Sequence, residues 1–387
     1  MLLNQHWQNA VGEDFSADFL EGYKIMAISA EMQRILALAR RENASDIHIV
    51  ANLPPMFRIN GEIVLADKPP LAREDTARLC FGLLNEEQQK AFERDWRLCC
   101  SLHDSKLGRF RVSIYYHVGN PEMSIRPVMD HIKTREELHL PEEVEDFTRM
   151  ASGLILITGP TGSGKTTTMN FMIDLINSEQ RCKIIAIEDP VEYIHKQKKA
   201  IIVQQELYTD VKSFSSALIH VLRQDPDVIC VGEMRDLETT ETALVAAETG
   251  HLVIATCHTP NTLQTVERIV CIFPENQQPQ IFTQLANCLQ GILAQRLVPS
   301  ADKKNRRLAT ELIIMNPAAR KHIRERQLYQ LTTVIQMGRK KGMHTMDDSL
   351  LELYESGEIT YDIAICNSHD PAAMRSRIHK ETLPKEQ

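Results

Sequence analysis

The sequence predicts an α/β protein with two domains, a smaller N-terminal α+β domain and a larger domain built on a mostly parallel sheet. Two observations predict this fold. The first third of the chain carries a helical pattern followed by segments of alternating polarity, whereas residues 149–368 carry short apolar runs that alternate with helical patterns. Single strands that alternate with helices are typical of a parallel sheet covered on both faces. The 387 residues are sufficient for two domains that each bury a core.

The N-terminal domain is predicted from its periodicity. A helix is expected from Lys24 to Arg40, where apolar residues recur mostly at helical spacing. Asn60-Gly61, which separates two alternating runs, is a strong signal for a hairpin. Strands are expected at residues 45–50, 56–59, 62–65, 109–116 and 123–126. These elements predict an antiparallel sheet flanked by a helix.

The second domain is predicted from four apolar runs of strand length. These runs are Leu154–Thr158, Ile184–Ile187, Val228–Val231 and Leu252–Thr256, and a helical run, Thr167–Ile176, follows the first of them. The predicted organisation is an extension at 1–24, a first domain at 25–129, a polar linker at 130–148, a second domain with C-terminal helices at 149–368 and a tail at 369–387.

The composition excludes several classes of protein. With 44 Lys and Arg against 52 Asp and Glu, the net charge is -8, so nucleic acid is not expected as a partner. No apolar run approaches the roughly 18 residues that a membrane helix requires, and we expect a cytoplasmic protein. The nine cysteines form no Cys-x-x-Cys pair, so reduced thiols are expected rather than a zinc site or a disulfide framework.

A glycine-rich segment, Gly159-Pro-Thr-Gly-Ser-Gly-Lys-Thr166, lies between a predicted strand and a predicted helix. This pattern in this context predicts a phosphate loop, because its glycines let backbone N–H groups approach phosphates at the positive end of a helix. Lys165 is expected to reach the β and γ phosphates, and Thr166 to offer a hydroxyl to magnesium. The residues expected to bind the nucleotide are Thr161, Gly162, Ser163, Gly164, Lys165, Thr166 and Thr167. ATP and Mg²⁺ are the expected cofactors.

Acidic residues follow the next predicted strand at its carboxyl end. Glu188, Asp189 and Glu192 come directly after Ile184–Ile187, which we expect to lie one strand from the phosphate loop. Ligands of open α/β sheets bind beyond the carboxyl ends of the strands. We therefore expect Glu188 and Asp189 to help Thr166 hold magnesium, and Glu192 to be a candidate catalytic acid. The alternative is a charged, solvated turn.

Two further groups end the remaining apolar runs. Glu233 follows Val228–Val231 and is expected to orient the attacking water. His258 follows the last run, and His251 precedes it. A phosphate-sensing role and a structural role are both open for these histidines.

Phosphoryl transfer also requires a positive charge that offsets the transition state. Arg109 and Arg111 share one face of a predicted strand, and Arg126 lies on the next strand. Arg223 and Arg235 are alternatives closer to the predicted site. A solvated strand face is the other interpretation of the first pair, and the sequence leaves open which arginine acts.

Several motifs occur in an order that resembles one family. Across residues 25–370, the chain resembles the type IV pilus retraction ATPases of the PilT family, within the secretion ATPase superfamily. Besides the phosphate loop, the resemblance rests on Ala44-Ser-Asp-Ile-His48, Arg109-Phe-Arg-Val112, Ile187-Glu-Asp-Pro-Val-Glu192, Leu222-Arg-Gln-Asp-Pro-Asp227, Val231-Gly-Glu-Met-Arg-Asp236 and the stretch from Glu248-Thr-Gly-His-Leu252 to His258.

The resemblance implies more than the residues alone. It implies a PAS-like N-terminal domain, a RecA-like ATPase domain and a homohexamer with nucleotide between the two domains. It also implies an inner-membrane pilus platform protein as partner, and hence a position at the cytoplasmic face of that membrane. The implied function is ATP hydrolysis that powers pilin disassembly and twitching motility.

The retraction branch of the superfamily is favoured because the chain lacks the tetracysteine insertion and the extra N-terminal domain of extension-type relatives. The segment Ala318–Glu325 resembles the retraction family's C-terminal helix motif but departs from it at Ala319, Lys321 and His322. Gln205 stands where the family commonly has arginine. A pilus assembly or conjugation ATPase, a weakly hydrolysing helper paralogue and an enzyme acting on nucleic acid remain as alternatives.

Overall fold

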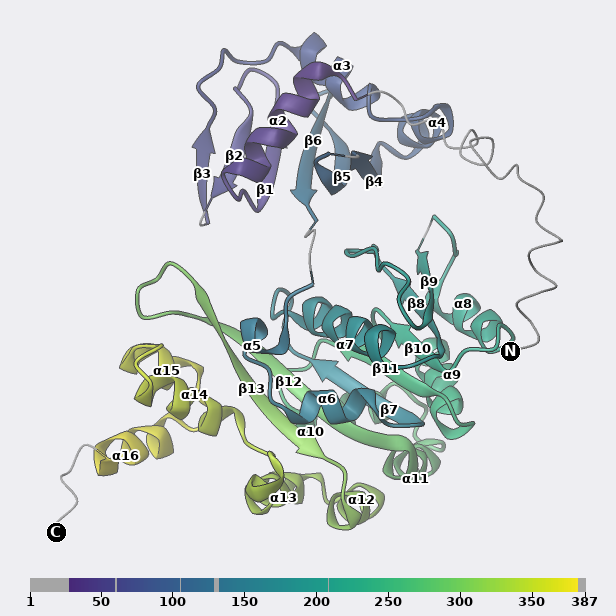
Figure 1. The fold of residues 1–387 in the computed structure, drawn as a ribbon, viewed down its shortest axis with the longest axis vertical. Coiled ribbons are helices and arrows are strands. Elements are labelled where there is room, and N and C mark those ends of the chain that lie inside the picture. Colours follow the sequence, from purple (N-terminus) through teal and green to yellow (C-terminus); the bar gives the residue numbers. More distant parts are fainter. Residues whose placement is uncertain (1–27, 60, 105, 129–131, 208, 382–387) are drawn as a thin grey trace, which may run out of the picture. The chain divides into compact units, whose positions relative to one another are not determined.

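The computed structural model describes residues 28–59, 61–104, 106–128, 132–207 and 209–381 (Figure 1). The predicted extension at 1–24 lies outside the described residues. Two compact units divide the chain, residues 1–128 and 129–387. No helix in the described ranges is long and apolar enough to cross a membrane.

The first unit is a six-stranded antiparallel sheet with helices. Its strand order is β3-β2-β1-β6-β5-β4, and every neighbouring pair is antiparallel. The elements are α2 (Ala30–Arg41), β1 (Asp46–Ile49), β2 (Met56–Ile59), β3 (Glu62–Leu65), α3 (Arg73–Phe81), α4 (Glu86–Asp95), β4 (Arg97–Asp104), β5 (Gly108–His117) and β6 (Asn120–Pro127). The predicted strands and the pairing of β2 with β3 are confirmed, whereas α3, α4 and β4 were not predicted.

Helix α2 illustrates how the sequence sets these elements. The side chain of Ser29 accepts a hydrogen bond from the backbone N–H of Met32, which makes Ser29 the N-cap. Met32, Ile35 and Leu36 are buried on one face of the helix and belong to the core that β1, β5 and β6 also line. The helix therefore begins at Ala30, and the predicted start at Lys24 falls outside the described residues.

The second unit is built on a seven-stranded sheet with the order β13-β12-β7-β11-β10-β8-β9. All neighbouring strands are parallel except β13, which pairs antiparallel with β12 at one edge. The strands are β7 (Gly153–Thr158), β8 (Lys183–Glu188), β9 (Ile201–Glu206), β10 (Val228–Val231), β11 (Leu252–Cys257), β12 (Leu289–Pro299) and β13 (Arg306–Ile314). The predicted mostly parallel sheet is confirmed.

Helices cover both faces of this sheet (Figure 1). Alternate residues of β7 point to opposite faces: Leu154 and Leu156 pack in one core, and Ile155 and Ile157 in the other. The first core holds residues of α8 (Phe214–Val221), α9 (Leu237–Glu248), α10 (Thr262–Cys271), α11 (Gln278–Cys288), α12 (Pro317–Arg324) and α13 (Leu331–Met337). The second holds residues of α6 (Glu143–Thr148) and α7 (Lys165–Glu179).

Residues 130–148, predicted as a linker, contain two helices, α5 (Arg135–Leu138) and α6. Val144 and Phe147 of α6 are buried in the same core as Ile155 of the sheet. Most of the predicted linker is therefore packed as part of the second unit. Its polar residues, which suggested a linker, lie on the outside of α5 and α6, where Arg135 pairs with Glu145 at 2.9 Å.

Three C-terminal helices, α14 (Met346–Glu355), α15 (Tyr361–Asn367) and α16 (Pro371–Glu381), form a separate small core. This core includes Val298 and Ala309 of the β12–β13 hairpin. Met374 and Ile378 of α16 are buried in it. The predicted tail at 369–387 thus contains a packed helix up to Glu381.

Candidate nucleotide-binding site

The phosphate loop, Gly159–Thr166, follows β7 at the carboxyl edge of the parallel sheet. The neighbouring strand β11 ends before His258, and β10, the next strand, ends shortly before Glu233. These three segments converge because parallel strands end at a common rim. Strand β8 is separated from β7 by β11 and β10. The expectation that Glu188, Asp189 and Glu192 stand one strand from the loop is therefore wrong.

The backbone of the phosphate loop requires glycine at two positions. Gly164 has φ +94° and caps the N-terminus of α7, a conformation that L side chains rarely adopt. At Gly159, a Cβ atom would lie 2.3 Å from the carbonyl oxygen of Gln295 and 2.6 Å from Oγ of Ser163. The loop therefore passes against β12 at a distance that only glycine permits.

Lys165 turns back onto the loop that it follows. Its Nζ donates to the carbonyl oxygens of Gly159 at 2.8 Å and Pro160 at 3.1 Å, and lies 3.5 Å from Nδ1 of His258. Burial lowers the pKa of Lys165 from its ordinary value, and the charge of Glu233 opposes that shift. These carbonyl oxygens accept the hydrogen bonds of the ammonium that the oxygen atoms of a bound phosphate would accept in their place. The side chain of Lys165 therefore already lies within the phosphate loop.

Ser163 provides a test of whether the loop fits a phosphate. Its Oγ is buried and has no hydrogen-bond partner among the residues that the structure describes. A buried hydroxyl without a partner is costly, and an oxygen atom of a bound phosphate would satisfy it. The loop thus combines a glycine N-cap in the left-handed conformation, a buried ammonium and a hydroxyl without a hydrogen-bond partner, which together suit an anionic ligand.

Glu233 is held by two basic side chains. Its Oε1 lies 2.5 Å from Nε of Arg235 and 3.0 Å from Nε2 of His258. Burial alone would raise the pKa of Glu233, but the hydrogen bonds from Arg235 and His258 outweigh burial, and the pKa lies below its ordinary value. Glu233 is therefore a carboxylate at neutral pH, which is the form that accepts a proton or orients water.

The acids at the end of β8 and just after it divide into one buried and two exposed side chains. Glu188 is 1% exposed, and its Oε1 accepts a hydrogen bond from Nε2 of Gln204 at 3.0 Å. Asp189 and Glu192 are exposed on the segment between β8 and β9. Carboxylate and hydroxyl oxygens are ligands that Mg²⁺ accepts, so Thr166 and Glu188 have suitable chemistry. Within the described ranges, no cluster of three or more His, Cys, Asp or Glu side chains is arranged to hold a metal.

The histidines at the two ends of β11 have different places. His258 is at the carboxyl end and contacts Glu233. His251 precedes β11 at the opposite edge of the sheet, and its Nδ1 lies 3.1 Å from the carbonyl oxygen of Ala246. Only His258 is therefore placed to respond to a phosphate.

The three candidate arginines of the first unit, Arg109, Arg111 and Arg126, lie on the partly exposed face of its sheet. Arg111 is directly opposite Arg126 in the pairing of β5 with β6, and Arg109 is two residues along β5 on the same face. Arg126 donates to Oδ1 of Asp46 at 2.7 Å, and Arg109 donates to Oγ of Ser101 at 2.8 Å. The shared face of Arg109 and Arg111 is as the sequence predicts, and the pairing of β5 with β6 adds Arg126 beside them.

One contact near the loop was not predicted. Thr158, the last residue of β7, donates from Oγ1 to the carbonyl oxygen of Thr259 at 2.5 Å. Oγ1 of Thr259 lies 2.7 Å from Oγ1 of Thr265 in α10. These hydroxyls tie the phosphate loop to the segment that carries His258. Thr158 ends an otherwise apolar strand, and a threonine in that place is the sequence signal that could have identified this contact.

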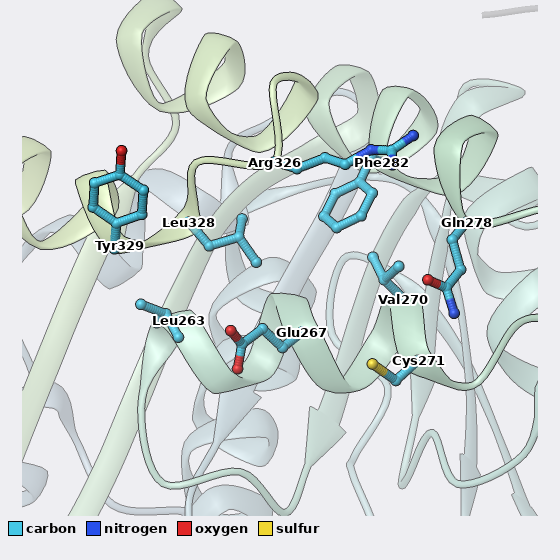
Figure 2. Close-up of a pocket in the computed structure, with 9 residues that line it drawn as sticks. All are labelled: Leu263, Glu267, Val270, Cys271, Gln278, Phe282, Arg326, Leu328 and Tyr329. Carbon is cyan, nitrogen blue, oxygen red and sulfur yellow. The ribbon is translucent and has the colours of Figure 1, made fainter. Parts of the chain in front are cut away.

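A cavity of about 560 Å³ opens elsewhere on the second unit (Figure 2). Its lining includes Val270 of α10, Phe282 of α11, and Arg326 and Leu328, which follow α12. The guanidinium of Arg326 lies over the ring of Phe282, 5.6 Å from its centroid. None of the residues that line this cavity belongs to the predicted nucleotide site.

A parallel sheet with a phosphate loop after one strand and a carboxylate after a nearby strand defines a P-loop ATPase. A family model described as "Type II/IV secretion system protein" matches residues 24–381. The chain belongs to this family.

Individual relatives agree with that assignment. The "Type IV pilus ATPase PilU" of Pseudomonas aeruginosa is 37% identical over 348 residues, which cover 90% of this chain and 91% of the relative. The "Type IV pilus retractation ATPase PilT" of the same species is 38% identical over 334 residues, covering 86% and 97%. A crystal structure described as the "Pilus Retraction Motor PilT and Bound ADP" superposes with a TM-score of 0.84 at 45% identity, covering 89% and 98%. The predicted resemblance, RecA-like fold class and ATPase class are confirmed.

Proposed function

We propose that the protein is a magnesium-dependent ATPase that works as a hexameric motor for type IV pilus retraction. The observation that carries the proposal is the convergence of Glu233 and His258 on Lys165, which supplies the groups that hydrolysis requires next to the loop that binds nucleotide. The similarity to pilus ATPases over nearly the whole chain supports the coupling to a pilus.

In the proposed reaction, the backbone N–H groups from Thr161 to Thr167 and the side chain of Lys165 hold the β and γ phosphates. A bound Mg²⁺ would neutralise phosphate charge, with Thr166 as a ligand and Glu188 and Asp189 acting on it through water. Each of these residues lies on the carboxyl-edge rim or on the segments that leave it.

Glu233 then orients a water molecule toward the γ phosphorus and accepts a proton as the new P–O bond forms. The bond to the bridging oxygen breaks, and ADP and phosphate leave. His258 responds to the phosphate through its contacts with Glu233 and Lys165. Glu192 is proposed as a second acid that helps to place the water.

The remaining parts of the proposal concern assembly. Arg109, Arg111 and Arg126 would offset the developing negative charge on a bound nucleotide, either in the same subunit or in a neighbour of the ring. The motor would act on an inner-membrane platform protein from the cytoplasmic face of the membrane. Nucleic acid has no part in the proposed reaction.

Two measurements test the proposed function. The purified protein should hydrolyse ATP in a magnesium-dependent manner, and DNA should not stimulate the reaction. Deletion of the gene should leave cells with excess pili that do not retract and with no twitching motility. Cells without surface pili would instead indicate an assembly motor and would overturn the retraction assignment.

A further inference from the structure

Helix α7, which begins with Lys165, holds the segment between β8 and β9 through one polar face. Asn170, Asp174 and Asn177 are spaced at i, i+4 and i+7, so they share that face. Asp174 accepts from Nζ of Lys198 at 2.7 Å, and Nδ2 of Asn177 donates to the carbonyl oxygen of Lys196 at 2.8 Å. The segment that carries Asp189 and Glu192 is therefore attached to the helix of the phosphate loop.

The contact nearest the phosphate loop is between Asn170 and His195. Nδ2 of Asn170 donates to the carbonyl oxygen of Thr166 at 2.9 Å, which leaves Oδ1 of the amide to accept. Nε2 of His195 lies 2.8 Å from this Oδ1, so the imidazole carries its proton on Nε2. Both side chains are buried, with exposed fractions of 3% and 5%.

The other side of the segment continues toward Glu188. The backbone N–H of His195 donates to Oε1 of Gln204 at 3.0 Å. Nε2 of the same amide donates to Oε1 of Glu188 at 3.0 Å. Residues that are distant in the sequence thus form one hydrogen-bonded series from the first turn of α7 to the buried acid at the end of β8.

Two observations indicate that the ring of His195 stays neutral and in one orientation. Nδ1 is buried without a hydrogen-bond partner among the described residues, so a second ring proton would be a buried donor without an acceptor. Burial also lowers the pKa of His195 to about 4, although the charge of Asp174 opposes this shift. A neutral imidazole of fixed tautomer can hold Asn170 and the segment between β8 and β9 at a fixed separation without a change in its charge.

We propose that Asn170, His195 and Gln204 are positioning residues that fix Glu188 relative to the turn that carries Lys165 and Thr166. The proposal rests on the proposed ATPase function. A buried, hydrogen-bonded series specifies geometry more sharply than apolar packing, because each donor and acceptor has one satisfied arrangement. A nucleotide that draws Lys165 and Thr166 toward its phosphates would then also set the position of Glu188.

The test compares substitutions that remove the hydrogen bond between His195 and Asn170 with one that can retain it. His195→Ala removes it, whereas His195→Gln keeps an amide N–H that can reach Asn170. Asn170→Ala breaks the series at the helix. Asn177→Ala is the matched control, because it removes a buried asparagine of the same helix whose side chain hydrogen-bonds to backbone groups of Lys196 and Lys198, outside the series. Thermal unfolding of each variant shows that it is folded.

The readouts are kcat and KM for ATP, and the binding of mant-ADP with and without Mg²⁺. We expect His195→Ala and Asn170→Ala to lower kcat about tenfold or more, with KM nearly unchanged. Both should bind mant-ADP normally in EDTA but lose part of the gain in affinity that Mg²⁺ gives. His195→Gln should recover most of the wild-type kcat, and Asn177→Ala should resemble the wild type.

The inference is overturned if His195→Gln is as impaired as His195→Ala, or if Asn177→Ala is as impaired as Asn170→Ala. It is also overturned by a normal kcat in Asn170→Ala, which decides the matter if His195→Ala does not fold. A wild-type protein that neither hydrolyses ATP nor binds mant-ADP would overturn the proposed function and this inference together. An active wild type with unaffected variants overturns the inference alone.

Discussion

Nε2 of His258 lies 3.0 Å from Oε1 of Glu233. The two residues follow β11 and β10, which are neighbours in the sheet, so their contact depends on two parallel strands ending at the same rim. Nδ1 of the same ring lies 3.5 Å from Nζ of Lys165. One imidazole therefore stands between the ammonium that would contact phosphate and the carboxylate that would act on water. A phosphate that draws Lys165 away from the loop carbonyls would change the surroundings of all three groups.

Glu233→Gln should abolish most hydrolysis while nucleotide binding survives. The amide has nearly the shape of the carboxylate but cannot accept a proton from water, so kcat should fall by about 10²-fold or more. The affinity for mant-ADP should stay close to that of the wild type, because Glu233 lies outside the phosphate loop. A variant that hydrolyses ATP at the normal rate would show that another residue activates the water.

Lys165→Ala separates the binding step from the chemical step. It removes the buried ammonium that the loop carbonyls now hold, and with it the charge that attracts the phosphates. Binding of mant-ADP should weaken by about tenfold or more. Equal nucleotide affinity in Lys165→Ala and Glu233→Gln would contradict the division of roles between them.

His258→Ala should lower kcat more than it weakens nucleotide binding. The substitution removes one of the two hydrogen bonds that hold Glu233, and the carboxylate then has more freedom of position. We expect a loss of about tenfold in kcat. His251→Ala is the matched control, since His251 stands at the opposite end of β11. Similar losses in both variants would indicate that the effect comes from destabilising β11 rather than from the site.

The sequence predicted the elements whose periodicity is set by burial. The apolar residues of β7, β8, β10 and β11 are buried, and the runs are short and end at polar residues or glycine, so their positions were predicted to within about two residues. β12 was missed because it begins at Leu289, directly after α11 ends at Cys288, without a turn residue between them. β13 was missed because, as an edge strand, it begins with the polar pair Arg306-Arg307.

The candidate site was predictable only as far as motifs and strand ends define it. The phosphate loop, Glu233 and His258 follow apolar runs directly. The predicted position of Glu188, one strand from the phosphate loop, was wrong because β11 and β10 lie between β7 and β8. The order of parallel strands depends on crossovers that local sequence does not encode. The pair Asn170 and His195 was missed for a similar reason, since tertiary packing brings together two single polar residues that belong to no motif.

The neutral state of His195 predicts a specific dependence of stability on pH. Its pKa is lowered to about 4 in the folded protein, chiefly by burial, while an unfolded histidine titrates near 6.5. As the pH falls from about 6.5 to 4, the unfolded chain gains a proton that the folded chain does not, so stability is lost in this range. The loss amounts to roughly 2 to 3 kcal/mol at about pH 4.5.

His195→Gln should remove this component, because glutamine does not titrate. Urea unfolding of both proteins at pH 7 and at about pH 4.5 measures the difference, and carboxylates that titrate in both proteins cancel in the comparison. Parallel loss of stability in the two proteins would mean that the imidazole of the folded wild type is protonated in this range.

Glu311 should stabilise the second unit by joining two helices to the sheet. It is 6% exposed on β13, and its Oε1 accepts from the backbone N–H of Thr262 at 2.8 Å and from its hydroxyl at 2.7 Å. Its Oε2 accepts from the backbone N–H of Met346 at 3.4 Å. Thr262 begins α10 and Met346 begins α14, so one carboxylate satisfies the N-termini of both helices, where negative charge is favourable.

Glu311→Ala leaves these buried N–H groups without an acceptor and opens a cavity, which should cost about 2 to 4 kcal/mol of unfolding free energy. Glu311→Gln should cost less, because an oxygen still faces Thr262. Glu358→Ala is the control: that side chain forms a partly exposed ion pair with Arg307, which is worth about 1 kcal/mol or less. Urea unfolding measures all three, and an equal cost for Glu311→Ala and Glu358→Ala would mean that water replaces the carboxylate at both helix ends.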